Sequence, residues 1–116
     1  MRHNPYYDPE SLGLEKISFE EPGLSYEFNT LCFWSTGDGR VFSAFDSGCS
    51  CPTPFEDYEA ETQAECVQLL ERVGSKEQAE QIFASWNNGG RDGGKLPQCE
   101  QDAAVFWVKH QLEKAI

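Results

Sequence analysis

Hydrophobic and polar side chains alternate with a period of two in three segments of the first half of the chain, residues 14–19, 24–34 and 40–45. A strand points successive side chains to opposite faces, so this period predicts three β-strands. Leu31 and Phe33 place further apolar side chains on the other face of the second segment. We therefore expect the later half of this strand to be buried on both sides.

Turn sequences separate the three predicted strands. Residues 22–23 are Pro-Gly, the pair favoured at the centre of a type II turn, and residues 37–39 contain the Asp-Gly pair typical of hairpins. Consecutive strands joined by short turns form an antiparallel meander. The sheet is therefore predicted over residues 14–46, after an irregular lead-in over residues 1–13.

A helical period replaces the strand period in the second half of the chain. Thr62 and Ser75 precede two apolar segments as N-caps, the first in a capping-box arrangement with Glu65. A third helix is predicted to begin near Pro97, because proline is favoured in a first turn. The positions expected to face the core, most of them spaced by three or four, are Cys66, Leu69, Leu70, Val73, Ala79, Ile82, Phe83, Trp86, Val105, Phe106, Val108 and Leu112.

Strands followed by helices are typical of an α+β domain. A chain of 116 residues is expected to form a single domain, 1–116. We predict a three-stranded antiparallel meander followed by three helices packed on one face. After the lead-in and the sheet, residues 47–61 are expected to form a loop and residues 62–116 the helical part.

The net charge of the chain is −11 at pH 7 and is unevenly distributed. Residues 1–62 contain twelve acidic and three basic side chains, a net charge of −9, whereas residues 63–116 carry −2. This field repels phosphate groups, which argues against direct nucleic-acid binding. It favours a protein partner with a basic surface. The alternative is that the acidic excess only maintains solubility.

Composition also bears on the compartment. The chain has no long apolar run, so neither a membrane span nor a membrane partner is predicted. Residues 1–20 lack the apolar stretch of a secretory signal. The chain has five cysteines, and this odd number fits a reducing environment. The sequence therefore predicts a cytoplasmic protein whose thiols are mostly reduced.

The most unusual segment lies between the last predicted strand and the helices. Cys49 and Cys51 are separated by one residue, whereas zinc sites usually separate their cysteines by two to four. Neighbouring acids raise the pKa of a thiol, which disfavours a reactive thiolate. No metal or cofactor is therefore predicted. A metal-stabilised or redox-responsive module built on Cys49 and Cys51 stays as an alternative.

The motifs of common enzyme families are lacking. A cysteine nucleophile needs a base, and the chain has only His3 and His110. His110 lies near the end of the third predicted helix, where positive charge is favourable. Residues 87–94 hold four glycines but join two predicted helices and lack the Lys-Ser/Thr pair of a phosphate loop. The sequence predicts that the protein is not an enzyme.

An interaction surface is the remaining candidate for the cysteine segment. Aromatic side chains surrounded by charge are typical of binding hot spots. Alternatively, the acids favour the N-terminus of the following helix, and Phe55 or Tyr58 packs onto the core. The predicted partner-binding residues are Asp46, Cys49, Cys51, Phe55, Glu56, Asp57, Tyr58 and Glu59.

Residues 46–56 read Asp-Ser-Gly-Cys-Ser-Cys-Pro-Thr-Pro-Phe-Glu. With Asn4-Pro5 in the lead-in and Phe33-Trp34 in the second strand, this segment resembles a group of small, uncharacterised actinobacteriophage proteins that carry DSGCSCP(S/T)PFE. The resemblance implies a phage origin and a setting in the host bacterial cytoplasm, and it brings no established activity. Small acidic phage proteins are often host-factor inhibitors or nucleic-acid mimics.

The leading hypothesis is therefore a non-enzymatic acidic phage accessory protein that binds a host or phage protein. A minor virion component is a further alternative.

Overall fold

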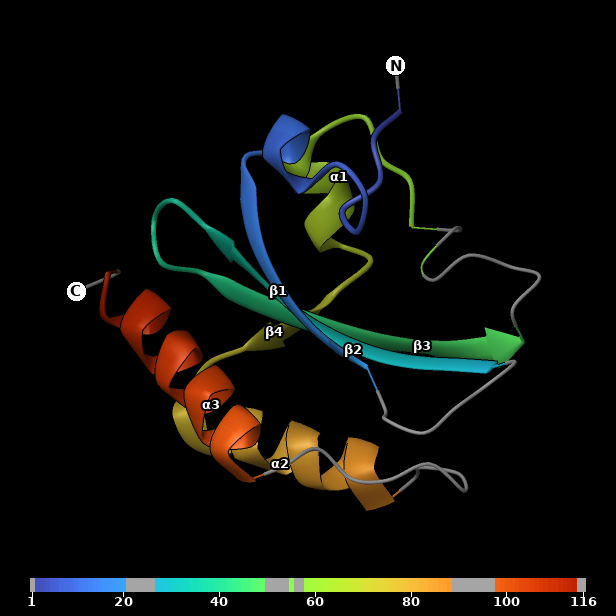
Figure 1. The fold of residues 1–116 in the computed structure, drawn as a ribbon. Helices are drawn as coiled ribbons and strands as arrows, with labels where there is room; N and C mark the ends of the chain where they lie inside the picture. Colours follow the sequence, from blue (N-terminus) through green and yellow to red (C-terminus); the bar gives the residue numbers. More distant parts are fainter. Residues whose placement is uncertain (1, 21–26, 50–54, 56–57, 89–97, 115–116) are drawn as a thin grey trace.

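The computed structural model describes residues 2–20, 27–49, 55, 58–88 and 98–114. These residues form an α+β fold with one four-stranded antiparallel sheet, three α-helices and a short 3₁₀ helix (Figure 1). In chain order the elements are η1 (Pro9–Leu12), β1 (Leu14–Glu20), β2 (Glu27–Thr36), β3 (Val41–Cys49), α1 (Gln63–Val67), β4 (Glu71–Val73), α2 (Lys76–Asn88) and α3 (Gln98–Glu113).

β1, β2 and β3 form the predicted meander, and the strand order of the sheet is β1-β2-β3-β4. The ten residues of β2 pair with β1 on one side and with β3 on the other. β3 is longer than the sequence predicted, because β2 supplies partners for it as far as Cys49, which lies opposite Glu27. Residues 47–49, which were expected in the loop, therefore belong to the sheet.

The fourth strand corrects the prediction of one helix running to Val73. α1 has only five residues and is followed by a turn, after which β4 pairs with residues 41–43 of β3. Val73 lies opposite Val41 and is buried there, while Leu69 is 47% exposed in the turn. A strand of three residues is too short to show a period of two, so the apolar spacing suggested a helix instead.

Helices cover both faces of the sheet, so the prediction that all three pack on one face is wrong. α2 and α3 lie on one side of the sheet, and η1 and α1 lie on the other (Figure 1). Leu31 and Phe33 of β2 pack toward α2 and α3. Cys32 and Trp34 pack toward η1 and α1. All four side chains are fully buried, which confirms the predicted two-sided burial of β2 and explains why both faces need a cover.

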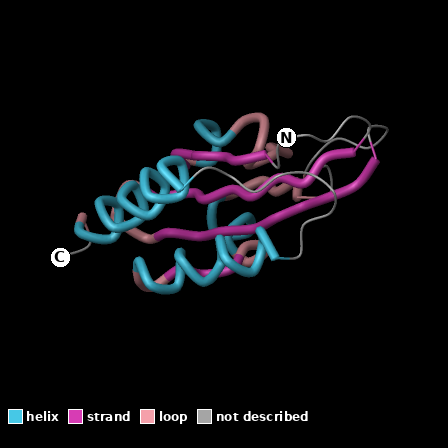
Figure 2. The backbone as a smooth tube through the Cα atoms, turned by 60° about the horizontal axis from the view of Figure 1, so that its bottom comes forward, coloured by secondary structure: helices cyan, strands magenta, loops and turns pink. Residues whose placement is uncertain are grey.

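α2 and α3 form the larger cover; in Figure 2, α3 lies at the left end of the strands, next to the C-terminus, and α2 lies along the lower edge of the sheet. The buried cluster on this α2 face comprises Leu31, Phe33, Val41, Val73, Ala79, Phe83, Trp86, Ala104 and Val108. The predicted period of α2 is thus confirmed. In α3 the prediction for Phe106 is wrong, since its side chain is 70% exposed. Ala104 and Gln111, which share the helix face of Val108, are buried instead.

The lead-in and the segment before α1 complete the opposite face, called the α1 face below. Its buried cluster comprises Leu12, Leu14, Cys32, Trp34, Phe55, Ala60 and Cys66. The indole Nε1 of Trp34 donates to the Pro5 carbonyl at 2.8 Å, and His3 forms an antiparallel bridge with Ala60. The predicted lead-in therefore packs into the core of the α1 face.

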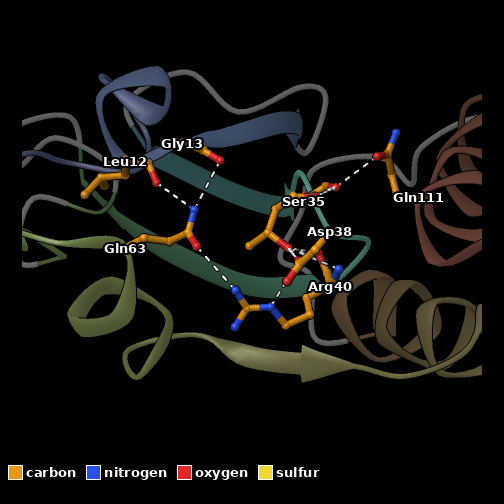
Figure 3. A network of polar contacts seen from close by, with 8 residues as sticks. Leu12, Gly13, Ser35, Asp38, Arg40, Gln63 and Gln111 are labelled. Atoms are coloured by element: carbon orange, nitrogen blue, oxygen red, sulfur yellow. Dashed lines mark hydrogen bonds and ion pairs between the residues drawn. The ribbon is translucent and has the colours of Figure 1, made fainter. Parts of the chain in front are cut away.

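Side-chain hydrogen bonds connect the layers (Figure 3). Gln63 Nε2 donates to the Leu12 carbonyl at 2.9 Å, and Gln63 Oε1 accepts from Arg40 Nη2 at 3.3 Å. This amide joins α1 to η1 and to the β2–β3 hairpin. On the other face the buried Ser35 hydroxyl donates to Gln111 Oε1 at 2.9 Å, which attaches α3 to the sheet.

Both predicted helix caps are confirmed. Thr62 Oγ1 accepts from the Glu65 amide at 3.1 Å, and Ser75 Oγ accepts from the Gln78 amide at 3.2 Å. These bonds satisfy amides that have no partner inside the first helical turn. The predicted Pro22-Gly23 turn, residues 89–94 of the glycine segment and Pro97 lie outside the described residues.

Candidate functional site

Asp46 organises the predicted partner-binding segment. Its Oδ2 accepts from the Phe55 amide at 2.8 Å, and its Oδ1 accepts from the Ser47 amide at 3.0 Å. One carboxylate on β3 therefore fixes the backbone of a residue nine positions later. Both oxygens carry out a structural role, since charged acceptors make the stronger hydrogen bonds to amides.

Phe55 is the centre of an aromatic cluster on the α1 face. Its side chain is fully buried, with ring centroids 5.2 Å from Tyr6, 5.6 Å from Trp34 and 5.2 Å from Tyr58. Its φ is 60°, a conformation that a bulky residue rarely adopts. Asn4 Nδ2 donates to its carbonyl at 2.7 Å. Phe55 thus packs onto the core, as the alternative interpretation expected, and offers no surface to a partner.

Tyr58 and Glu59 lie at the margin of this cluster. Tyr58 is half-buried, and burial raises the pKa of its hydroxyl, with a further rise from the charge of Asp46. Glu59 is exposed, and Arg2 donates to its carbonyl at 2.7 Å. Cys49 is described only as the last residue of β3. Three other predicted residues, Cys51, Glu56 and Asp57, lie outside the described part of the chain.

The predicted residues therefore divide into two groups. Asp46, Phe55 and Tyr58 come together, and they form a corner that holds the chain between β3 and α1. Glu59 points outward beside Glu61 and Glu65, and all three side chains are exposed. We call these three glutamates the acidic surface.

Arg2 is the cation that the described structure places against the acidic surface. Its Nε lies 3.8 Å from Glu59 Oε2, and its Nη2 lies 3.5 Å from Glu65 Oε1. Half of the side chain of Arg2 is solvent-exposed. Pairs of this kind contribute little stability, because water and salt screen them. The surface keeps a negative field after this pairing.

The cysteines with described side chains differ in their accessibility. Burial raises the pKa of the Cys32 thiol to about 12 and that of Cys66 to about 11. Both lie in the core of the α1 face, where they act as small apolar residues. Cys99 is exposed near the start of α3. Within the described residues, no three His, Cys, Asp or Glu side chains are grouped so that they could hold a metal ion.

The two histidines lie on different parts of the molecule. His3 Nδ1 is 2.9 Å from Asp8 Oδ2, and hydrogen bonds from Ser11 and His3 lower the pKa of Asp8. His110 is exposed on α3, where its ring stacks on Phe106 with centroids 6.5 Å apart. The structure therefore shows His3 as part of the lead-in and His110 as a helix-surface residue.

A groove that the sequence did not reveal lies on the α2 face. It has a volume of about 620 Å³ and lies between α2 and the strands β2, β3 and β4. Phe45 forms one wall and is 63% exposed, although it lies opposite the fully buried Leu31. The groove is lined by Asn29, Leu31, Ser43, Ala44, Phe45, Ser47, Glu71, Gln78, Gln81, Ile82, Ser85 and Trp86.

The floor of the groove is preorganised. Trp86 Nε1 donates to Asn29 Oδ1 at 2.9 Å, and both residues are buried. Glu71 is the one charged residue of the lining. Five of the twelve lining residues are apolar and the others are polar or charged, so the groove combines apolar contact area with hydrogen-bonding groups, as binding sites do. The sequence could not indicate this groove, because its lining comes from α2 and three strands that are far apart along the chain.

The fold is a four-stranded meander with two helices on one face and a short helix with the lead-in on the other, which defines a small α+β protein. Residues 3–97 match the family model described as a domain of unknown function (DUF7574), and the chain belongs to this family. The matched residues include the whole sheet, α1 and α2. No curated protein and no solved structure matches the chain.

In the described part of the chain, no helix is both long and apolar enough to cross a membrane.

Proposed function

We propose that the protein acts by binding, without catalysis, a protein partner that presents a basic surface to the acidic surface. The observation that carries this proposal is the exposure of Glu59, Glu61 and Glu65 within seven residues, with only the half-exposed Arg2 placed against them in the described structure. Charges of one sign on a rigid surface attract the opposite charge and accelerate association.

The rigidity of the acidic surface supports the proposal. Ala60, between two of the glutamates, is fully buried and bonded to His3 in both directions, at 2.7 and 2.9 Å. Thr62 caps α1 immediately afterwards. The carboxylates are thus displayed from a backbone that is already ordered, which lowers the entropy cost of binding.

The chemistry of the two buried cysteines favours binding over catalysis. The Cys32 and Cys66 thiols are buried with raised pKa values, so little thiolate forms near neutral pH. The host or phage identity of the partner, and action as an inhibitor or nucleic-acid mimic, belong to the same proposal and follow from the resemblance to actinobacteriophage proteins.

A pull-down from an actinobacterial lysate tests the proposal. The bait variant replaces the acidic surface by Glu59→Lys, Glu61→Lys and Glu65→Lys. A matched control carries Glu77→Lys, Glu80→Lys and Glu100→Lys, which change the net charge equally on α2 and α3. We expect the first variant to lose a partner that the wild type and the control retain, and added salt to weaken that interaction. If both variants recover the partner equally, the charge of the acidic surface does not account for binding.

A further inference from the structure

The outer edge of β3 is only partly covered. β4 pairs with Val41, Phe42 and Ser43, and within the described residues no strand pairs with the outer edge of residues 44–49. An uncovered edge presents backbone N–H and C=O groups in the arrangement that accepts another strand. The chain enters β4 at Glu71, opposite Ser43, from the turn at residues 68–70, so β4 covers nothing beyond Ser43.

The register identifies which groups face outward. The Thr36 amide donates to the Arg40 carbonyl at 3.0 Å, which marks this as a hydrogen-bonded position of the hairpin. Hydrogen-bonded and non-bonded pairs alternate along an antiparallel ladder. Along the regular β2–β3 register, the backbone groups of Ala44 therefore point to β2, whereas those of Phe45 and Ser47 point to the outer edge.

The outward-facing backbone groups of Ser47 and Phe45 differ in whether they have a hydrogen-bond partner. The Ser47 amide donates to Asp46 Oδ1 at 3.0 Å, which agrees with its position outside the β2 ladder. For the Phe45 amide and carbonyl, no partner is found in the described part of the chain. The edge is thus open at Phe45, directly after the last rung contributed by β4.

The groove on the α2 face lies beside this open edge. Phe45 projects on the same face as Leu31, its partner across the ladder. A strand added next to Phe45 would direct alternate side chains toward Ile82 and Trp86, on the groove wall formed by α2. Backbone hydrogen bonds and a side-chain pocket therefore meet at one place, the combination used in recognition by strand addition.

We propose that the edge of β3 at Phe45 and the adjoining groove bind an extended segment of a protein partner, which adds to the sheet in line with β4. The segment places an apolar side chain against Phe45, Ile82 and Trp86. It places a lysine or arginine beside Glu71. This inference goes beyond the proposed function, because the edge at Phe45 and its groove lie on the α2 face, apart from the acidic surface beside α1.

Charge selects this occupant over a second copy of the chain. Each chain carries a net charge of −11, so two copies would repel each other. A basic segment meets the one charged residue of the lining with the opposite sign.

Selection of a displayed library of random peptides against the full chain tests the proposal. We expect enriched peptides to combine apolar and basic residues. Their affinity should fall about tenfold with Phe45→Ala and about threefold with Glu71→Gln. Phe106→Ala and Glu80→Gln are matched controls, because these exposed residues lie outside the groove, and they should leave the affinity unchanged.

Amide exchange measured by NMR reports strand addition directly. In the free protein the Phe45 amide should exchange rapidly, while that of Ala44 is protected by β2. A bound peptide should slow exchange at Phe45 about tenfold or more and leave Ala44 unchanged. Together with the effects of Phe45→Ala and Glu71→Gln, this result would establish binding by strand addition at the edge of β3.

Three results would overturn the proposed mode. One is that no peptide is enriched, and another is that peptides bind without slowing exchange at Phe45. The third is a dimer of the free protein in which Phe45 is protected, which would assign the edge to a second copy. None of these decides the proposed function, which depends on the acidic-surface variant in the pull-down.

Discussion

One phenylalanine on each face of the sheet shows how the two faces differ. On the α1 face, Phe55 is fully buried and Asp46 holds its backbone. On the α2 face, Phe45 is 63% exposed beside a groove. On the α1 face Phe55 is covered by Tyr6, Trp34 and Tyr58, whereas the edge of β3 beside Phe45 is open because β4 begins only at Glu71, opposite Ser43. Cover, rather than hydrophobicity, therefore decides which phenylalanine is available to a partner.

The largest expected difference in stability is between alanine substitutions of these two phenylalanines. Phe55→Ala should lower the free energy of unfolding by about 3–5 kcal/mol, because it leaves a cavity among three aromatic rings. Phe45→Ala should change it by only about 0.5 kcal/mol, since most of that side chain is already in water. Urea denaturation of both variants gives the comparison. Similar losses from the two substitutions would contradict the assignment of one as core and the other as surface.

Alkaline pH should destabilise the α1 face selectively. The folded-state pKa of Cys32 is raised from 9.0 to about 12 by burial, so the folded protein binds this proton more tightly than the unfolded chain does. This contribution to stability is fully present below pH 9 and is lost as the pH rises toward 12. For a thiol that stays protonated in the folded state, the loss is about 1.4 kcal/mol per pH unit above its unfolded pKa.

Denaturation midpoints between pH 8 and pH 11 measure this effect. Cys66, with a pKa of about 11, contributes with the same sign, and the raised pKa of Tyr58 adds to it at higher pH. The buried cluster of the α2 face contains no ionisable side chain. The Cys32→Ala variant should therefore show a shallower decline with pH than the wild type. An unchanged slope would mean that the thiol ionises in the folded state.

Periodicity predicted the long elements of both faces from the sequence. Leu31 to Trp34 were recognised as buried on both sides, and the caps Thr62 and Ser75 were placed correctly. β4 was missed because Cys66 and Val73, spaced as on one helix, are separated by a turn and face different cores. Three residues carry too little local signal to overcome such a spacing.

The candidate site was less predictable than the fold for a related reason. Residues 46–59 have an unusual composition, and the described residue Phe55 within them has a constrained backbone with a φ of 60°. Composition alone cannot separate such a constraint from a binding surface. The open edge at Phe45 depends on where a distant strand begins, and no local pattern at Phe45 records that.

A smaller difference is expected in how far the loss of a helix cap unfolds the helix on each face. Thr62→Ala and Ser75→Ala should each lower the free energy of unfolding by about 1 kcal/mol, since each removes one acceptor for an amide of the first turn. The local responses should differ, because α1 has five residues and α2 has thirteen. Hydrogen exchange should show loss of protection throughout α1 in the first variant and only at the first turn of α2 in the second. Global loss of protection in both would indicate that the faces unfold as one unit.

The smallest expected effect on stability belongs to the acidic surface. Arg2→Ala removes two exposed ion pairs, to Glu59 and Glu65, and should lower the free energy of unfolding by less than about 1 kcal/mol at low salt and by less at high salt. It also makes the acidic surface more negative, so association with a basic partner should become faster as stability falls slightly. Urea denaturation and association kinetics at two salt concentrations separate the two effects. Slower association would show that Arg2 contacts the partner, and a loss of several kcal/mol would show that it ties the lead-in to the α1 face.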